Sequence, residues 1–210
     1  ADVSLQLLLL RGRHFFSMLR EMFPPDLDFF AAAVSPLWDT MAISFLGTAL
    51  GSLSGVAGTF FCNSFVNRNT WVRVLLKSIV QAVRCIPVLI LALLCTFLIG
   101  LGPLAGIVAI TVTTASVLAR LGYEDSESTD PQGAQALEAA GAGRVKAYAA
   151  SVWKQVLPGY LNNLLYVLEA NVRNAALLGF VGAGGIGLLL NEKMAWREYG
   201  KAGAILCLLY

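Results

Sequence analysis

Two long stretches without a charged residue limit what this chain can fold into. Residues 40–67 and residues 85–119 contain no Asp, Glu, Lys or Arg. A helix needs roughly 20 consecutive apolar residues to cross the hydrocarbon core of a bilayer. The first stretch suits one crossing, and the second is too long for one helix and suits two short ones. Residues 100–103, Gly-Leu-Gly-Pro, predict the turn between them, because Gly permits unusual φ angles and Pro suits a helix start.

The composition supports a chain that lies in lipid. Of the 210 residues, 57% are apolar and 13% are charged, whereas a soluble domain is about half apolar and about a quarter charged. So few polar side chains cannot cover a water-facing surface, which excludes a soluble enzyme and a disordered protein. The net charge of +2 does not indicate the strongly basic surface that is typical of nucleic-acid-binding proteins. The lipid bilayer is therefore an expected partner, and nucleic acid is not.

Two further apolar stretches complete the predicted spans. One runs from about residue 155 to residue 180 and is interrupted by Glu169 and Arg173, and the other begins near Trp196. An open sheet in lipid would leave its edge N–H and C=O groups unpaired, so every span is predicted to be helical. The predicted fold class is all-α, a polytopic membrane protein of about five to six spanning helices.

The chain ends and the positive charges predict the topology. The chain begins at Ala1 and stops inside the apolar run 202–210, so we expect truncation at both ends. The internal loops 64–84 and 120–157 hold eight Lys and Arg residues against six on the opposite side, which favours a cytoplasmic position for both loops. Residues 1–36 then lie outside as an interfacial segment, and residues 1–210 form one transmembrane domain.

No residue pattern predicts a catalytic or metal site. Cys62, Cys85, Cys95 and Cys207 are scattered through apolar stretches without a C-x-x-C pair, so buried thiols are expected rather than a zinc site or disulfides. His14 is the single histidine, which leaves no base for a Ser or Cys nucleophile, and we expect it to be solvated or interfacial. The chain also has no G-x-x-x-x-G-K-[ST] motif. If ATP drives this protein, another chain hydrolyses it.

The charged pair in the fourth predicted span is the clearest single candidate. Glu169 and Arg173 stand four residues apart with Glu first, the favourable order for an ion pair on one helix face. A charge inside the bilayer is costly, so ionisable residues there are functional candidates. Arg173 would help an anion past a gate while Glu169 holds its guanidinium. A structural ion pair between helices is the alternative. Asn171 is a third pathway candidate, although it projects from a different face.

Two groups of glycines predict close helix packing or a turn. Gly47, Gly51 and Gly55 form G-x-x-x-G twice, which favours packing within the chain; a subunit interface or a pathway lining is the alternative. A second group formally matches the dinucleotide motif G-x-G-x-x-G, but it follows a membrane helix rather than a strand. A tight re-entrant turn is expected there instead. The residues of this turn are Gly182, Gly184, Gly185 and Gly187.

The long polar loop predicts two short helices joined at a glycine elbow. It starts with an acidic run at 124–130, and a short helix is expected over 132–140. Residues 141–143, Gly-Ala-Gly, break that helix, and a second helix is expected over 144–156, running to Leu157-Pro158. Such a helical knob on the cytoplasmic side suits the groove of another protein. An ordinary amphipathic loop is the alternative.

At this point the sequence resembles a known family. The loop is similar to the EAA coupling loop of permeases from binding-protein-dependent ABC importers, on the residues Gln135, Glu138, Ala139, Ala140, Gly141, Gly143, Arg144, Leu157 and Pro158. The segments 169–176 and 179–187 resemble the phosphonate, phosphite and hypophosphite importers in particular, as do 23–26, 47–50 and 100–103. Gln135 stands where the family usually has an acidic residue, and Trp153-Lys154 replaces its usual Leu-Pro.

The resemblance implies a type I ABC importer permease fold, like that of the methionine importer permease. It implies a second permease subunit, identical or homologous, an ABC ATPase dimer that carries ATP and Mg²⁺, and a periplasmic substrate-binding protein. The expected function is alternating-access import of a small phosphorus oxyanion across the bacterial inner membrane, with no cofactor and no metal on this chain. A self-sufficient secondary transporter or channel for a small anion is the alternative. It would predict an internal repeat, and the sequence shows none.

Overall fold

The protein is built from helices that run between two distant ends. A computed structural model describes residues 12, 16–23 and 25–209, and these contain no strand. Residues 16–22 are helical. His14 lies outside the described residues. The elements that follow are η1 (Leu27–Phe29), α2 (Phe30–Cys62), α3 (Thr70–Arg84), α4 (Val88–Ile99), α5 (Pro103–Ser128), α6 (Gln132–Ala139), α7 (Arg144–Ala150), α8 (Val152–Leu178), η2 (Gly179–Val181), α9 (Ile186–Ala195) and α10 (Tyr199–Leu209).

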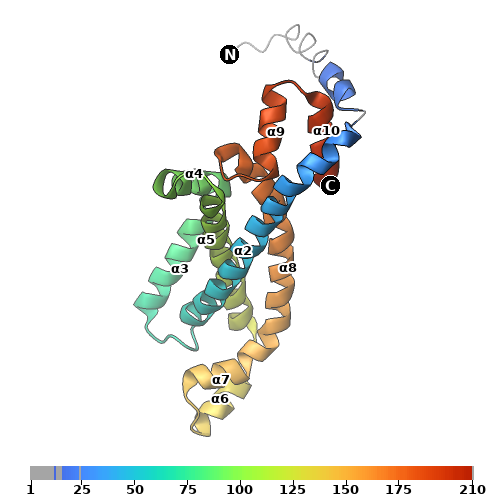
Figure 1. Ribbon diagram of the computed structural model, residues 1–210. Coiled ribbons are helices and arrows are strands. Elements are labelled where there is room, and N and C mark those ends of the chain that lie inside the picture. The colour runs from blue at the N-terminus through green and yellow to red at the C-terminus, as the bar shows by residue number, and fades with distance from the viewer. Residues whose placement is uncertain (1–11, 13–15, 24, 210) are drawn as a thin grey trace.

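Long apolar helices form the body of the molecule. Among the described residues, α2, α5 and α8 with η2 are each long and apolar enough to cross a membrane. The pair α3 and α4 passes the same test only together, and the two helices are bent by 94°. α10 is a shorter apolar helix at the end of the chain. α6 and α7 lie at one end of the molecule, and α9 and α10 lie at the other (Figure 1).

The second predicted span differs from the structure. α4 has 12 residues, about 18 Å of helix, which is too short for a core of roughly 30 Å. The preceding segment, predicted as a loop over 64–84, contains the 15-residue helix α3. Arg73, Lys77 and Arg84 lie along one side of α3, so no charge-free window marks it in the sequence. The Asn69 side chain caps it by accepting from the N–H groups of Trp71 and Val72.

Other predicted boundaries also shift. α2 begins at Phe30 and includes Pro36, so the last residues of the predicted outer segment 1–36 belong to a spanning helix. α5 continues through the acidic run to Ser128, and α8 begins at Val152. The loop between these spans therefore covers residues 129–151 rather than 120–157. The helix α9 begins inside the segment for which the sequence predicts only a turn, and α10 begins near the expected residue 196.

The parallel helices α2 and α5 pack through small residues. A Cβ on Gly47, Gly51 or Gly55 would lie within 3.0 Å of an α5 side chain. The three α5 partners follow at the same spacing of four residues: Ile110, Thr114 and Leu118. Because the side chains are small, the two backbones approach closely along several turns. These contacts are the packing within the chain that the G-x-x-x-G spacing favours.

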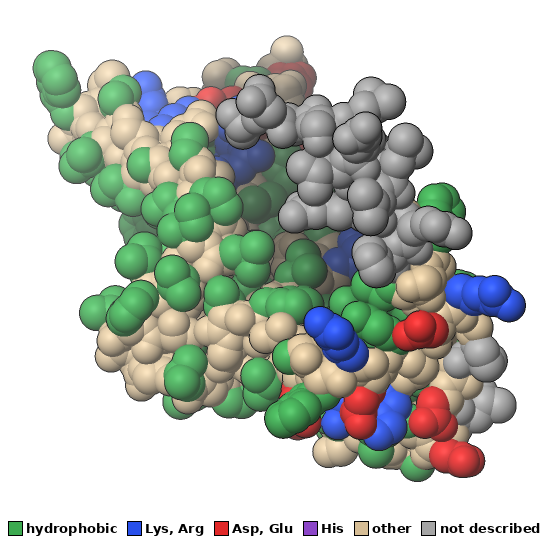
Figure 2. Space-filling model, turned by 90° about the horizontal axis from the view of Figure 1, so that it is seen from above, with side chains coloured by type: hydrophobic (Ala, Val, Ile, Leu, Met, Phe, Trp, Pro, Cys, Tyr) green, Lys and Arg blue, Asp and Glu red, His purple; other side chains and the backbone are tan. Residues whose placement is uncertain are grey.

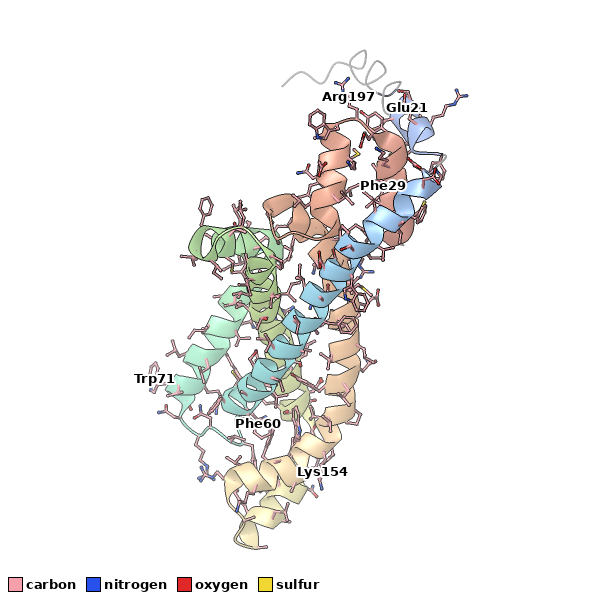
Figure 3. The ribbon with its side chains drawn as sticks, viewed as in Figure 1. Glu21, Phe29, Phe60, Trp71, Lys154 and Arg197 are labelled. Carbon is pink, nitrogen blue, oxygen red and sulfur yellow. The ribbon has the colours of Figure 1, made fainter. Side chains whose placement is uncertain are left out.

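The outer surface is largely apolar. Seen from the end that carries α9 and α10, hydrophobic side chains cover much of the outline, and charged side chains gather in a few places (Figure 2). Trp71, at the start of α3, points away from the other helices (Figure 3) and is 86% exposed. Cys62 and Cys95 are buried, but Cys85 and Cys207 are exposed free thiols. The prediction of buried thiols is therefore wrong for these two: Cys85 lies in the turn after α3, and Cys207 lies on an exposed side of α10.

Candidate functional site

The predicted ion pair forms on an uncovered face of α8. Arg173 Nη1 donates to Glu169 Oε1 at 2.9 Å, and the two side chains are 55% and 67% exposed. Tyr166 and Leu177 are also exposed on this stretch of helix, at 67% and 49%. A charged pair facing hydrocarbon is unfavourable even when paired. We therefore take this stretch of α8 as the candidate pathway face, one that needs water or another chain against it.

Asn171 lies between Glu169 and Arg173 in sequence but points into the helix bundle. Its side-chain Nδ2 donates to Thr48 Oγ1 on α2 at 2.9 Å and to Thr114 Oγ1 on α5 at 2.7 Å. The side chain is 4% exposed, and the Ser44 hydroxyl donates to the Asn171 backbone carbonyl. Both amide hydrogens are used within the chain. Asn171 is therefore a packing residue where three helices meet, which corrects its prediction as a pathway residue.

The glycine-rich segment after α8 forms a tight turn between helices. Gly182, Gly184 and Gly185 have positive φ angles, where L side chains are strained. The Gly182 carbonyl accepts from the N–H of Gly102, in the turn before α5, at 3.1 Å. The Ile186 N–H donates to the Thr40 hydroxyl on α2 at 2.8 Å. The turn thus joins α2, α5 and α8 at the end away from α6 and α7.

Gly187 occupies the tightest position of that segment. A Cβ at Gly187 would collide with the Ala176 carbonyl oxygen of α8 and would also lie within 3.1 Å of the Gly179 Cα. No side chain fits between the start of α9 and the end of α8. The four predicted glycines therefore serve close backbone approach and turn geometry.

The helices α6 and α7 form the predicted knob. The elbow between them contains Gly141 at φ +94° with open space around it. Arg144 Nε donates to Glu138 Oε1 across the elbow at 2.9 Å. The second helix, α7, is shorter than predicted. It ends at Ala150, because Ser151 departs from helical geometry with φ −112° and ψ −74°. Leu157 and Pro158 therefore lie inside α8, in its second turn, and not at the end of the knob.

A small core fixes the knob to the spanning helices. Ala147, Tyr148 and Val152 are buried together. The Tyr148 ring meets Phe60 of α2 edge to face at 4.8 Å between centroids, and Phe60 lies near the knob in Figure 3. The Tyr148 hydroxyl hydrogen bonds Ser126 of α5 at 2.6 Å. Burial raises the pKa of Tyr148 above its ordinary value.

Phe60 and Tyr148 are not among the residues predicted from the sequence. A tyrosine in a short helix and a phenylalanine in an apolar span give no local signal that they meet. Gln135, predicted as a coupling residue, lines a cavity of about 280 Å³ together with Tyr148 and Ser126. The knob is therefore held on α2 and α5 by side chains that only the fold brings together.

The knob exposes small and apolar residues around its elbow, next to the exposed side chains of Gln135 and Lys146. Ala139, Ala140, Gly141 and Gly143 are exposed, and Val145 is 56% exposed. A short helical pair with such a surface can lie in an apolar groove of another protein. No other part of the described chain covers this surface.

Comparison with known proteins gives the family. Residues 47–209 match the family described as the binding-protein-dependent transport system inner membrane component. The chain is 32% identical over 194 residues to the phosphate-import permease protein PhnE of Mycolicibacterium smegmatis, covering 90% of this chain and 36% of that protein. It is 37% identical over 134 residues to a putative phosphite transport system permease protein, HtxE of Stutzerimonas stutzeri, covering 64% of this chain and 51% of that protein.

Solved structures show the same fold. The permease of the inward-facing MetNI methionine ABC transporter superposes with a TM-score of 0.76 at 24% identity, over 88% of this chain and 90% of that chain. The architecture is thus that of a type I ABC importer permease, as the resemblance implied. The chain spans about a third of the first of these relatives and half of the second. With the family match extending over most of its length, the chain belongs to the inner membrane components of binding-protein-dependent transport systems.

Proposed function

We propose that this chain is the permease subunit of an ATP-driven importer for a small phosphorus oxyanion in a bacterial inner membrane. The family match and the permease fold support the transport role. The relatives are named for phosphate import and phosphite transport, and both anions are tetrahedral phosphorus species with negatively charged oxygens. Phosphate, phosphite and phosphonates therefore form the substrate class that we propose.

The pathway runs along the candidate pathway face of α8. The observation that carries this assignment is the exposed Glu169–Arg173 pair on a helix that is long and apolar enough to cross the membrane. A second permease, identical or homologous, would face this surface and enclose a water-filled path between the two copies. Arg173 supplies a cation to the passing anion, and Glu169 orients its guanidinium through the 2.9 Å hydrogen bond.

The knob transmits the conformational change of a separate ATPase to the spanning helices. This chain has no phosphate-binding loop for ATP, so ATP and Mg²⁺ would be bound by an ABC ATPase dimer. The outer surface of α6 and α7 docks in a groove of that dimer, and its displacement rocks the spanning helices between inward-open and outward-open states. A periplasmic binding protein would deliver the anion to the opposite end.

The test is uptake by proteoliposomes that contain the intact transporter. We expect uptake of labelled phosphate, phosphite or methylphosphonate that requires internal ATP, the ATPase and the binding protein. Vesicles prepared without the ATPase are the control. Uptake at the full rate in that control would identify a self-sufficient secondary transporter or channel instead. ATP-dependent uptake of an unrelated substrate, with no uptake of the three anions, would contradict the proposed substrate class.

A further inference from the structure

The last turn of α5 contacts three other parts of the chain through adjacent residues. Glu127 accepts from Lys77 Nζ on α3 at 2.9 Å to each carboxylate oxygen. It also accepts from the backbone N–H of Ser64, in the segment after α2, at 3.2 Å. Ser126, one residue earlier, hydrogen bonds Tyr148 of α7. One turn of helix therefore joins α3, the end of α2 and the knob.

The Lys77–Glu127 pair is better placed than an ordinary surface ion pair. The two side chains are 25% and 31% exposed, so water and salt screen the pair less than they screen fully exposed charges. Lys77 Nζ also lies 4.4 Å from the centre of the Tyr123 ring, which adds a cation–π contact. Two charge-assisted hydrogen bonds and a ring fix the ammonium group. Each partner belongs to a different helix, so the pair ties α3 to α5, beside the Arg120–Gln81 hydrogen bond between the same helices.

The helix that Lys77 holds leads to the opposite end of the molecule. α3 continues through a 94° bend into α4. Cys95 and Ala92 of α4 pack in one cluster with Ala105 and Leu178, next to the glycine turns joined by the Gly102–Gly182 hydrogen bond. A shift of α3 would therefore reach the glycine turns through α4, beside the direct route along α5.

We propose that Lys77 and Glu127 are positioning residues for transport, forming a clamp that makes α3 and α4 follow the movement of the knob. This inference rests on the proposed function, because it assigns a route for coupling in an ATP-driven importer. With the clamp intact, α3 and α5 move as one body when the knob moves. Without it, α5 moves while α3 lags, and ATP is hydrolysed without a completed transport cycle.

The test measures ATP hydrolysed per anion transported by the complete transporter in proteoliposomes. Glu127→Gln keeps the side-chain size and an acceptor for Ser64 but removes the charge. We expect it and Lys77→Met to raise that ratio by about fivefold, the lower end of typical coupling effects. Lys77→Arg keeps a cation over Tyr123 and should retain the wild-type ratio. The double variant Lys77→Met with Glu127→Gln should be no worse than either single variant, because both break the same contact.

The matched control is Glu124→Gln. Glu124 pairs with Arg120 within α5 at 2.7 Å, so its loss breaks an ion pair without separating two helices. Arg120 keeps its hydrogen bond to Gln81 of α3. An unchanged ratio in both single clamp variants, or an equal rise in Glu124→Gln, would overturn the clamp. If the Glu127→Gln transporter fails to assemble, the ratios of ATP hydrolysed per anion in Lys77→Met and Lys77→Arg test the clamp instead. A wild-type transporter that takes up none of the three anions contradicts the proposed function and not the clamp.

Discussion

At the scale of single residues, Asn171 shows how one amide can fix the crossing of three membrane helices. Its two N–H groups are shared between Thr48 on α2 and Thr114 on α5. In lipid no water replaces a lost partner, so a satisfied polar group at a helix junction favours one arrangement over others. The neighbouring charges Glu169 and Arg173 point outward instead. The same helix turn therefore has a packing residue on one side and the proposed pathway residues on the other.

Replacing Asn171 with Leu should destabilise the permease. The variant loses two interhelical hydrogen bonds, and we expect the free energy of unfolding to fall by about 1–2 kcal/mol. Thermal unfolding of the purified protein in detergent measures this change. Asn162→Leu is the control, because Asn162 is exposed on the same helix. Equal melting temperatures for wild type and Asn171→Leu would show that the junction does not depend on the amide.

At the scale of elements, the elbow between α6 and α7 holds the knob in one shape. Gly141 has a φ angle of +94°, and a Cβ added there would meet no atom within 4 Å. Gly143 is equally open but has a φ angle of −67°. Only the first position is costly for an L side chain, by about 1–2 kcal/mol. The elbow therefore depends on backbone conformation rather than on space.

Gly141→Ala should weaken coupling, and Gly143→Ala should not. The first substitution strains the elbow and turns the outer surface of α6 relative to that of α7, so docking to the ATPase suffers. ATPase activity that responds to the loaded binding protein is the measurement. We expect the stimulated rate of Gly141→Ala to fall and that of Gly143→Ala to equal wild type. An equal loss of stimulated ATPase activity in both variants would indicate that the added methyl group acts by steric contact at the interface and not through the φ angle of Gly141.

The turn between α9 and α10 is held by an ionic cluster. Lys201 donates to Glu198 at 3.0 Å, and Lys193 lies 3.2 Å from the same carboxylate. The hydrogen bond from Lys201, followed by that from Lys193, lowers the pKa of Glu198 from its ordinary value of 4.5. A lowered folded-state pKa stabilises the fold above the unfolded value, and that stabilisation is lost as the pH falls through the folded pKa.

The stability contributed by Glu198 should therefore disappear in acid. We expect wild type to melt at a higher temperature than Glu198→Gln at about pH 6, and the gap to close as the pH falls through the lowered folded-state pKa of Glu198. Melting curves of both proteins across this range, in one detergent and at one ionic strength, test the prediction. A gap of constant size at every pH would mean that the carboxylate acts through packing rather than charge.

The way each element is stabilised determines whether it could be predicted from the sequence. α2, α5 and α8 are marked by apolar runs, and the Gly-Pro turn before α5 lies where the residues predict it. α3 could not be found this way, because its three cations interrupt the apolar run, and Glu127, the partner of Lys77, is remote in sequence. The knob core depends on Phe60 and Tyr148 meeting across the fold. Glu169 and Arg173 are recognisable, since four residues separate them on one helix.

At the scale of the whole molecule, the two ends are joined by long parallel and antiparallel helices. α5 extends from the glycine turns to the knob, and α2 packs along it through glycines. Such packing leaves little freedom for one helix to slide against the other. The body formed by α2, α5 and α8 is therefore suited to rocking as a unit, which is what alternating access requires.

The candidate pathway face lies on the outside of that body, so its role is visible only in the assembled transporter. Arg173→Ala should lower the anion uptake rate by about tenfold. A barrier to the rate-limiting step that is higher by roughly 1.4 kcal/mol has this effect. The ATPase should still copurify with this variant, because the knob lies at the far end of α8. Arg84→Ala removes an exposed cation from α3 and is expected to transport normally. Equal uptake by the two variants would make the Arg173 pair a structural feature of α8. A loss confined to Arg173→Ala, with assembly intact, would place the passing anion beside this helix.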